Sequence, residues 1–253
     1  MRGAWRGRVM ALASAVALGA AGCGGAADES AARIRVLAAA SLSGAFDELA
    51  SEFQTTGRGV SVELNFGGSS SLREQILAGA PADVFASANT STMTQVVDAG
   101  VVTRPEKFAT NQLQIAVPAG NPAGVTGLAD FADPDLTVGL CAEEVPCGQL
   151  GRDALAGMRI TPSIDTNEPN VRALLTKVQA GELDAGIVYR SDVLNAGDAV
   201  EGIDIPAEVN VTSAYCIAVL KGSGRPEVAA AFVAFVLSEE GQAILASYGF
   251  DAP

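Results

Sequence analysis

Short apolar runs typical of buried strands alternate along most of the chain with amphipathic stretches typical of helices. Residues 34–39 form one such run, and Leu42, Phe46, Leu49 and Phe53 then repeat at helical spacing. Further strands are predicted at 60–66, 83–87, 113–117, 136–140, 184–189 and 214–220, with helices near 72–76, 93–97, 148 onward, 171–178, 228–236 and 244–248. This alternation predicts an α/β fold of mostly parallel sheets with helices on both faces.

The chain is long enough for two modest lobes. Its 253 residues are 49% hydrophobic, and two small sheets fit this length better than one large sheet. Loop-like segments at 118–127 and 206–212 are the predicted crossings between the lobes. We therefore expect residues 33–116 and 213–253 to form lobe 1 and residues 117–212 to form lobe 2.

The first 22 residues are predicted to be a secretory signal outside the fold. Three arginines form a basic start, and an apolar run follows from Val9 to Ala21. This run is shorter than the roughly 20 apolar residues that span a bilayer. Small residues precede Cys23, as in a bacterial lipobox, so we expect lipidation at Cys23 and a flexible tether over residues 23–32. The alternative is an ordinary signal peptide with an incidental cysteine.

The charge balance limits the partners of the exported chain. Removal of residues 1–22 leaves 13 basic and 29 acidic residues, a net charge of −16. Such a chain is not expected to bind nucleic acid or an anionic membrane surface, and its membrane contact is expected through the lipid anchor alone. Any anion that it binds must therefore be held by local dipoles and not by bulk electrostatic attraction.

Cysteine and histidine usage argues against catalysis and metal coordination. The chain has no histidine, which excludes Ser-His-Asp and Cys-His machinery, and no nucleotide-binding or zinc-site spacing occurs. Cys141 and Cys147 lie close in sequence, and we expect them to form a disulfide in an oxidising compartment, with two free thiols as the alternative. Cys216 lies in an apolar run and is predicted to be a small buried core residue.

Four predicted helix starts that follow strands are rich in hydroxyls, glycine or proline. They lie at Ser41, at residues 67–71, at residues 145–148 and at residues 167–170. Ser41 is placed as an N-cap, and Ser71 with Glu74 fits a capping box. Helix N-termini present unpaired amides and a partial positive charge, so they bind anions without a basic residue. In parallel sheets these starts converge beyond the carboxyl ends of the strands.

A series of motifs resembles the periplasmic molybdate-binding proteins. The matching motifs, in the order of that family, are Val36–Leu42, Ser69–Leu72, Gly79–Ala88, Val145–Gly148, Asn170–Arg172, Gly186–Tyr189 and Tyr248–Phe250. The resemblance runs from about Arg33 to the end of the chain. It implies a two-lobed type II periplasmic-binding-protein fold with the ligand in the cleft between the lobes, in a monomer that serves the permease of an ABC importer.

The resemblance also implies a set of ligand-binding residues. Ser41 and Ser69 would hold one side of an oxyanion, with Ser70 as the alternative to Ser69. The amides of Cys147 and Val171 and the hydroxyl of Tyr189 would complete the shell from the other lobe. The implied ligand-binding residues are therefore Ser41, Ser69, Cys147, Val171 and Tyr189. No catalytic residue, cofactor or directly coordinated metal is expected, because the molybdenum would be held as its oxyanion.

A shell of donors suits a fully deprotonated tetrahedral dianion such as molybdate, and tungstate, which has the same shape and charge, should bind too. Hydrogen phosphate carries a proton that would stay unpaired, at a cost of roughly 1–3 kcal/mol. Sulfate, another small anion, or an organic acid is the first alternative; a carboxylate would call for a clamp from Arg172 or Arg190. The second alternative is an exported enzyme, whose base would have to be a carboxylate or lysine with a perturbed pKa.

Overall fold

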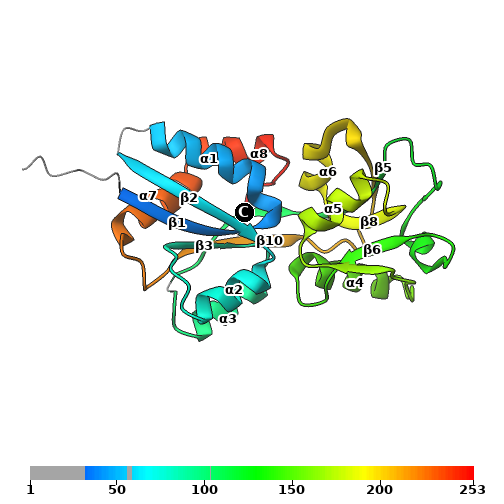
Figure 1. Ribbon diagram of the computed structural model, residues 1–253, viewed down its shortest axis with the longest axis horizontal. Coiled ribbons are helices and arrows are strands. Elements are labelled where there is room, and N and C mark those ends of the chain that lie inside the picture. The colour runs from blue at the N-terminus through cyan, green and yellow to red at the C-terminus, as the bar shows by residue number, and fades with distance from the viewer. Residues whose placement is uncertain (1–31, 56–58, 103) are drawn as a thin grey trace, which may run out of the picture. The chain divides into compact units, whose positions relative to one another are not determined.

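The computed structural model describes residues 32–55, 59–102 and 104–253. The predicted signal peptide over residues 1–22, the lipidation site at Cys23 and the tether up to residue 31 lie outside these residues. The described chain forms two five-stranded sheets with helices on both faces (Figure 1). The α/β fold with two sheets that the sequence predicted is confirmed.

The first sheet combines the N-terminal strands with one strand from near the C-terminus. Its order is β2 (Val60–Gly67), β1 (Ala32–Ala39), β3 (Val84–Ser87), β10 (Ser213–Val219) and β4 (Glu106–Asn111). Strands β2, β1 and β3 are parallel, and β10 runs antiparallel to both of its neighbours. One face is covered by α1 (Ser43–Thr55), α7 (Pro226–Val236) and α8 (Glu239–Ser247), and the other by α2 (Ser69–Leu77) and α3 (Thr90–Asp98). A short 3-10 helix, η1 (Ala40–Leu42), joins β1 to α1.

The second sheet repeats this plan with residues from the middle of the chain. Its order is β7 (Thr166–Glu168), β6 (Val138–Cys141), β8 (Ala185–Tyr189), β5 (Leu113–Pro118) and β9 (Val200–Asp204). Strands β7, β6 and β8 are parallel, and β5 runs antiparallel to β8 and β9. Helix α4 (Pro146–Gly157) covers one face, and α5 (Val171–Gln179) and α6 (Arg190–Ala196) cover the other. Short 3-10 helices lie at η2 (Leu128–Ala132) and η3 (Gly197–Ala199).

The chain passes between the sheets at two points, one of which differs from expectation. Strand β4 is followed by β5 after the single residue Gln112, so the first crossing lies before Leu113. The assignment of residues 113–116 to lobe 1, with a crossing at 118–127, is therefore corrected: β5 belongs to the second sheet, where it pairs with β8 and β9. The chain returns through residues 205–212 from β9 to β10. Division into two moving lobes is still a prediction.

The sequence pattern explains which strands were foreseen. The central strands β1, β3, β6 and β8 are almost continuously buried apolar runs, as parallel strands covered on both faces should be. The strands that the pattern missed are β4, β7 and β9, and all three lie at sheet edges. Edge strands are short, polar and half solvated, so their apolar signal is weak. Helix α6 was also missed.

Aromatic side chains fasten the helices to the first sheet. The rings of Phe46 in α1 and Phe232 in α7 meet at 6.2 Å between centroids, and Phe46 also meets Phe108 of β4 at 5.8 Å. All three side chains are fully buried, and such tilted pairs add to the hydrophobic free energy of burial.

Among the described helices none is individually long and apolar enough to cross a membrane; only α7 and α8 together, bent by 60°, meet that length and composition.

Candidate functional site

A small cavity lies beyond the carboxyl ends of strands from both sheets. Its empty volume, counted together with the open solvent at its mouth, is ≈ 200 Å³. The structure brings all five nominated residues to its wall: Ser41, Ser69, Cys147, Val171 and Tyr189. Ser69 lines the cavity, whereas Ser70, although buried, is not among the described lining residues. These positions suit a compact ligand.

Four helix beginnings meet at this cavity. Ser41 lies in η1, Ser69 is the first residue of α2, Cys147 is the second residue of α4, and Val171 is the first residue of α5. First-turn N–H groups have no acceptor within their own helix and carry the positive end of the helix dipole. No lysine, arginine, aspartate or glutamate is found among the described residues that line the cavity. The hydrogen-bond donors that this wall offers are therefore uncharged hydroxyl and N–H groups.

The structure contradicts both capping predictions, the one for Ser41 and the one for Ser71. Ser41 is not an N-cap: its hydroxyl lies 2.9 Å from the hydroxyl of Tyr215 in β10. The Ser71–Glu74 capping box is also wrong, because α2 begins at Ser69 with Gly68 as its N-cap and no side-chain cap. Capping rules use local spacing alone, whereas here the chain leaves β2 at Gly67 and enters α2 two residues later, at Ser69.

Ser69 is held in an orientation that leaves its proton free. Its Oγ accepts a hydrogen bond from the backbone N–H of Ala88 at 3.0 Å. An amide N–H can only donate, so the Ser69 hydroxyl uses a lone pair in this bond and keeps its own proton for another partner. Both Ser69 and Ala88 line the cavity.

Tyr189 ends β8 with a buried hydroxyl that lacks a partner. The side chain is 1% exposed, and its hydroxyl is the one buried side-chain polar atom without a hydrogen bond in the described part of the chain. Burial raises the pKa of this phenol well above its ordinary value, and the nearby hydroxyls of Ser213 and Tyr215 offset the rise in part. An unpaired buried hydroxyl costs roughly 1–3 kcal/mol. This atom therefore indicates a ligand that would accept a hydrogen bond from the Tyr189 hydroxyl.

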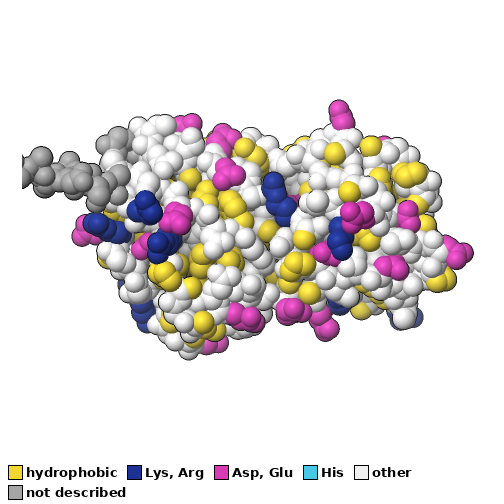
Figure 2. Space-filling model, in the orientation of Figure 1, with side chains coloured by type: hydrophobic (Ala, Val, Ile, Leu, Met, Phe, Trp, Pro, Cys, Tyr) yellow, Lys and Arg dark blue, Asp and Glu magenta, His cyan; other side chains and the backbone are white. Residues whose placement is uncertain are grey.

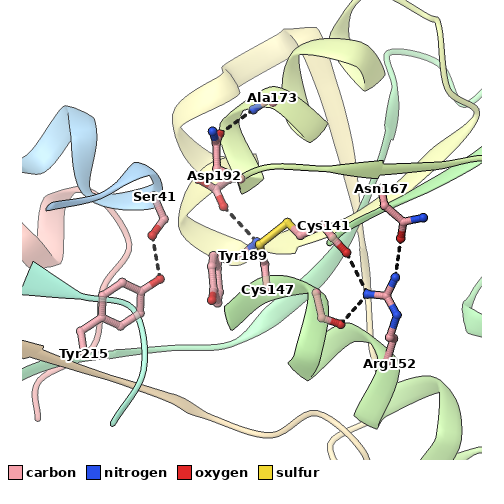
Figure 3. The surroundings of a disulfide bond; sticks show 11 residues. Ser41, Cys141, Cys147, Arg152, Asn167, Ala173, Tyr189, Asp192 and Tyr215 are labelled. Atoms are coloured by element: carbon pink, nitrogen blue, oxygen red, sulfur yellow. Dashed lines mark hydrogen bonds between the residues drawn. A yellow bond between two sulfur atoms is a disulfide. The ribbon is translucent and has the colours of Figure 1, made fainter. Parts of the chain in front are cut away.

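The predicted disulfide fastens the beginning of α4 to the end of β6. Cys141 and Cys147 are bridged, with their Cα atoms 5.8 Å apart, as Figure 3 shows beside Tyr189. Gly148 follows the bridge, and a Cβ there would lie 1.9 Å from the carbonyl oxygen of Ala142. Close approach of the two backbones therefore requires glycine at this position. Cys216 is a free and buried cysteine, as expected from its apolar surroundings.

The helix that begins with Val171 has its own cap. Asn170 is the N-cap of α5, and its side-chain oxygen accepts a hydrogen bond from the backbone N–H of Ala173 at 2.9 Å. This cap holds the first turn in place. Val171 lies at the cavity, and its first-turn N–H has no acceptor within the helix.

The two arginines beside the nominated residues point elsewhere. Arg172 donates to the hydroxyl of Ser43, the first residue of α1. Arg190 donates to Asp251 Oδ2 at 2.7 Å and to the carbonyl oxygen of Gly249 at 3.2 Å. Neither side chain belongs to the described lining of the cavity, so the arginine clamp that an organic acid would require is missing from these residues.

Two buried residues near the site escaped the sequence patterns. Asp192 accepts a hydrogen bond from the backbone N–H of Tyr189 at 3.0 Å (Figure 3). Burial raises the pKa of Asp192 to about 7, against the opposing effects of that N–H and of Arg172. Tyr215 is the second, with its hydroxyl beside Ser41. The only signal for Tyr215 was a lone hydroxyl inside a strongly apolar strand.

The visible molecular surface carries no concentration of positive charge. Lysine and arginine side chains are scattered across the face in Figure 2, among acidic ones. The sequence has 29 acidic against 16 basic residues. The fold and the cavity thus define a class: an α/β solute-binding protein in which neutral donors from two sheets line one small cavity.

The comparisons with known proteins agree with this class. The chain belongs to the family of bacterial extracellular solute-binding proteins, whose model matches residues 34–251. The molybdate-binding protein ModA of Mycobacterium tuberculosis is 41% identical over 223 residues, covering 87% of this chain and 85% of that protein.

Solved structures share the fold. The periplasmic molybdate-binding protein of Azotobacter vinelandii has a TM-score of 0.77 at 19% identity, covering 87% of this chain and 99% of that one. The sulfate-binding protein SubI of Mycobacterium tuberculosis has a TM-score of 0.76 at 20% identity, covering 87% of each chain.

Proposed function

We propose that this chain is an extracytoplasmic binding protein that captures molybdate, and tungstate as well, for the permease of an ABC importer. The observation that carries the proposal is the wall of the cavity, where neutral donors and the unpaired hydroxyl of Tyr189 converge with no charged side chain among the described lining residues. The 41% identity to a molybdate-binding protein over 87% of the chain supports this choice of anion.

The proposed binding shell divides between the two sheets. Ser41 and Ser69 supply donors from the first, and the amides of Cys147 and Val171 with the hydroxyl of Tyr189 supply donors from the second. Molybdate is a dianion whose four oxygens are all acceptors, so each donor finds a partner. Helix dipoles add favourable potential for the negative charge, which explains how an acidic protein can hold a dianion.

Capture would proceed by closure of two lobes over the anion. Each lobe holds part of the shell, so only the closed and occupied state satisfies both parts. In the described structure the two sides already touch, through Arg172 and Ser43 and through Gly68 and the carbonyl oxygen of Pro169. Docking on the permease and reopening would then release the anion.

The lipid anchor at Cys23 and the monomeric state belong to the same proposal. An anchor on residue 23 would keep the protein at the outer face of the membrane near its permease. Metabolic labelling with a radioactive fatty acid tests this: the wild type should be labelled and Cys23→Ala should not.

Calorimetric titration with molybdate, tungstate, sulfate and phosphate tests the central proposal. We expect tight binding of the first two and weak or no binding of phosphate. Sulfate is the second candidate, because it too is a dianion with acceptors only and the fold is shared with a sulfate-binding protein. If only sulfate gives a heat of binding, sulfate would replace molybdate as the proposed ligand. If none of the four anions gives a heat of binding, the proposal of oxyanion binding is rejected.

A further inference from the structure

A buried tyrosine from the first sheet reaches the Ser41 hydroxyl from behind the cavity wall. Tyr215 is 0% exposed, and its hydroxyl lies 2.9 Å from Ser41 Oγ (Figure 3). Its ring packs edge to face against Tyr189 at 5.8 Å, Phe108 at 6.2 Å and Phe250 at 5.3 Å between centroids. Three rings therefore restrict the Tyr215 side chain and hold its hydroxyl beside Ser41.

A bound oxyanion decides which of these two hydroxyls donates. The oxygens of the anion can only accept, so Ser41 must direct its single proton at the ligand. The Ser41 oxygen then faces Tyr215 with a lone pair, and Tyr215 has to be the donor. With the opposite direction, Ser41 would turn lone pairs toward the anion and repel it.

The other serine of the site follows the same pattern. Ser69 Oγ accepts from the N–H of Ala88 at 3.0 Å, which leaves the Ser69 proton for the ligand. In each case a donor behind the serine occupies one lone pair and orients the hydroxyl. For Ser69 the donor is a backbone amide, and for Ser41 it is the side chain of Tyr215.

The Tyr215 hydroxyl keeps its proton near neutral pH, because its pKa is raised above the ordinary value. Burial raises its pKa well above the ordinary value, and the neighbouring Tyr189 and Asp192 raise it further, while Ser41 and Asn111 offset the rise only in part. The protonated phenol is therefore able to donate a hydrogen bond to Ser41.

We infer that Tyr215 is a positioning residue for the anion, which donates its hydrogen bond to Ser41 and so turns the Ser41 proton into the cavity. This inference rests on the proposed function of the site. It assigns a role in binding to a residue that is not among the described residues in the cavity wall. The role is separate from packing, because the ring contacts survive removal of the hydroxyl alone.

The test is a double-mutant cycle of Tyr215→Phe with Ser41→Ala, read by calorimetric titration with molybdate. We expect Tyr215→Phe to weaken binding about fivefold, the effect of losing one neutral hydrogen bond. In the Ser41→Ala background the same change should have no further effect, whereas with Ser69→Ala the losses should multiply. Tyr248→Phe is the matched control, since its hydroxyl bonds to Glu48 at 2.9 Å, and it should bind as the wild type does.

The outcomes separate this inference from the proposed function. If the wild type binds no oxyanion, the proposed function fails first. If the wild type binds and Tyr215→Phe binds equally well, the inference is overturned while the function stands. An equal loss with and without Ser41 would also overturn it, because Tyr215 would then act through packing. Thermal unfolding of each ligand-free variant shows that the proteins compared are folded.

Discussion

Tyr189 has a buried hydroxyl without a hydrogen bond in the described residues. Tyr189→Phe removes one of the proposed donors to the anion. Hydrogen bonds to charged groups contribute about 1.5–3 kcal/mol, so we expect molybdate affinity to fall about ten- to a hundredfold. The ligand-free protein should be as stable as the wild type or more stable, since an unpaired polar atom is removed. Titration and thermal unfolding measure the two effects, and a drop in stability without a loss of affinity would contradict the assignment.

Asp192 should make stability depend on pH. Its pKa is raised to about 7 in the folded chain by burial, whereas the unfolded chain has an ordinary value near 3.8. The stability from the raised pKa is fully present below about pH 4 and is lost as pH rises through about 7, at roughly 1.4 kcal/mol per pH unit. Asp192→Asn keeps an acceptor for the N–H of Tyr189 but cannot ionise.

Urea unfolding of the wild type and Asp192→Asn at several pH values isolates this effect. As pH rises from 4 to 7, the free energy of unfolding of the wild type should fall relative to that of Asp192→Asn. The comparison isolates Asp192 because the other groups titrate equally in both proteins. A difference that does not change with pH would mean that the pKa of Asp192 is the same in the folded and unfolded chains.

The beginning of α4 depends on the bridge between Cys141 and Cys147. The bridge joins a strand end to the turn that offers the amide of Cys147, so its loss should loosen that donor. In Cys141→Ser with Cys147→Ser we expect a loss of about 2 kcal/mol in the free energy of unfolding, from the entropy of the short loop, and a several-fold weaker affinity.

Chemical denaturation and titration of this double variant measure both effects. Cys216→Ala is the control, since Cys216 is free and buried in the first sheet, and its molybdate affinity should equal that of the wild type. Unchanged affinity in the bridge variant would show that the helix start is held by the packing of Gly148 and by the bonds of Arg152 to the carbonyl oxygens of Cys141 and Gly148.

Closure of the two lobes can be tested at a point where their backbones nearly touch. A Cβ at Gly68 would lie 2.6 Å from the carbonyl oxygen of Pro169, which belongs to the opposite side of the cavity. The backbone of Gly68 has φ of −62° and ψ of 133°, which any residue adopts. Gly68→Ala should therefore leave the open lobe unstrained and obstruct only the closed state.

We expect Gly68→Ala to lower molybdate affinity at least about tenfold, because part of the binding energy must go into separating the two backbones. Small-angle scattering should show less compaction on addition of molybdate than in the wild type, with an unchanged melting temperature of the ligand-free protein. Gly222→Ala, where a Cβ would meet nothing within 4 Å, is the matched control. Full compaction of the Gly68 variant would contradict closure at this contact.

Local patterns were sufficient for the α/β class and the central strands, whereas the five residues at the cavity were predicted through the resemblance of the motifs to a known family. The reason is that buried strands and amphipathic helices have short periods, and helix starts follow strands within a few residues. The edge strands β4, β7 and β9 lacked such a signal, and the sheet pairing of Leu113–Pro118 could not be read from its own alternation, which fits either sheet.

Contacts between distant segments lay beyond those patterns. Ser41 and Tyr215 are 174 residues apart in the chain, and the directions of Arg172 and Arg190 depend on Ser43 and on the C-terminal residues. The raised pKa of Asp192 arises from burial, which depends on tertiary packing and not on the residues adjacent to it in the sequence. Residue type and order along the chain thus set which donors exist, while folding set which donors meet, because hydrogen bonds and desolvation depend on distances in space.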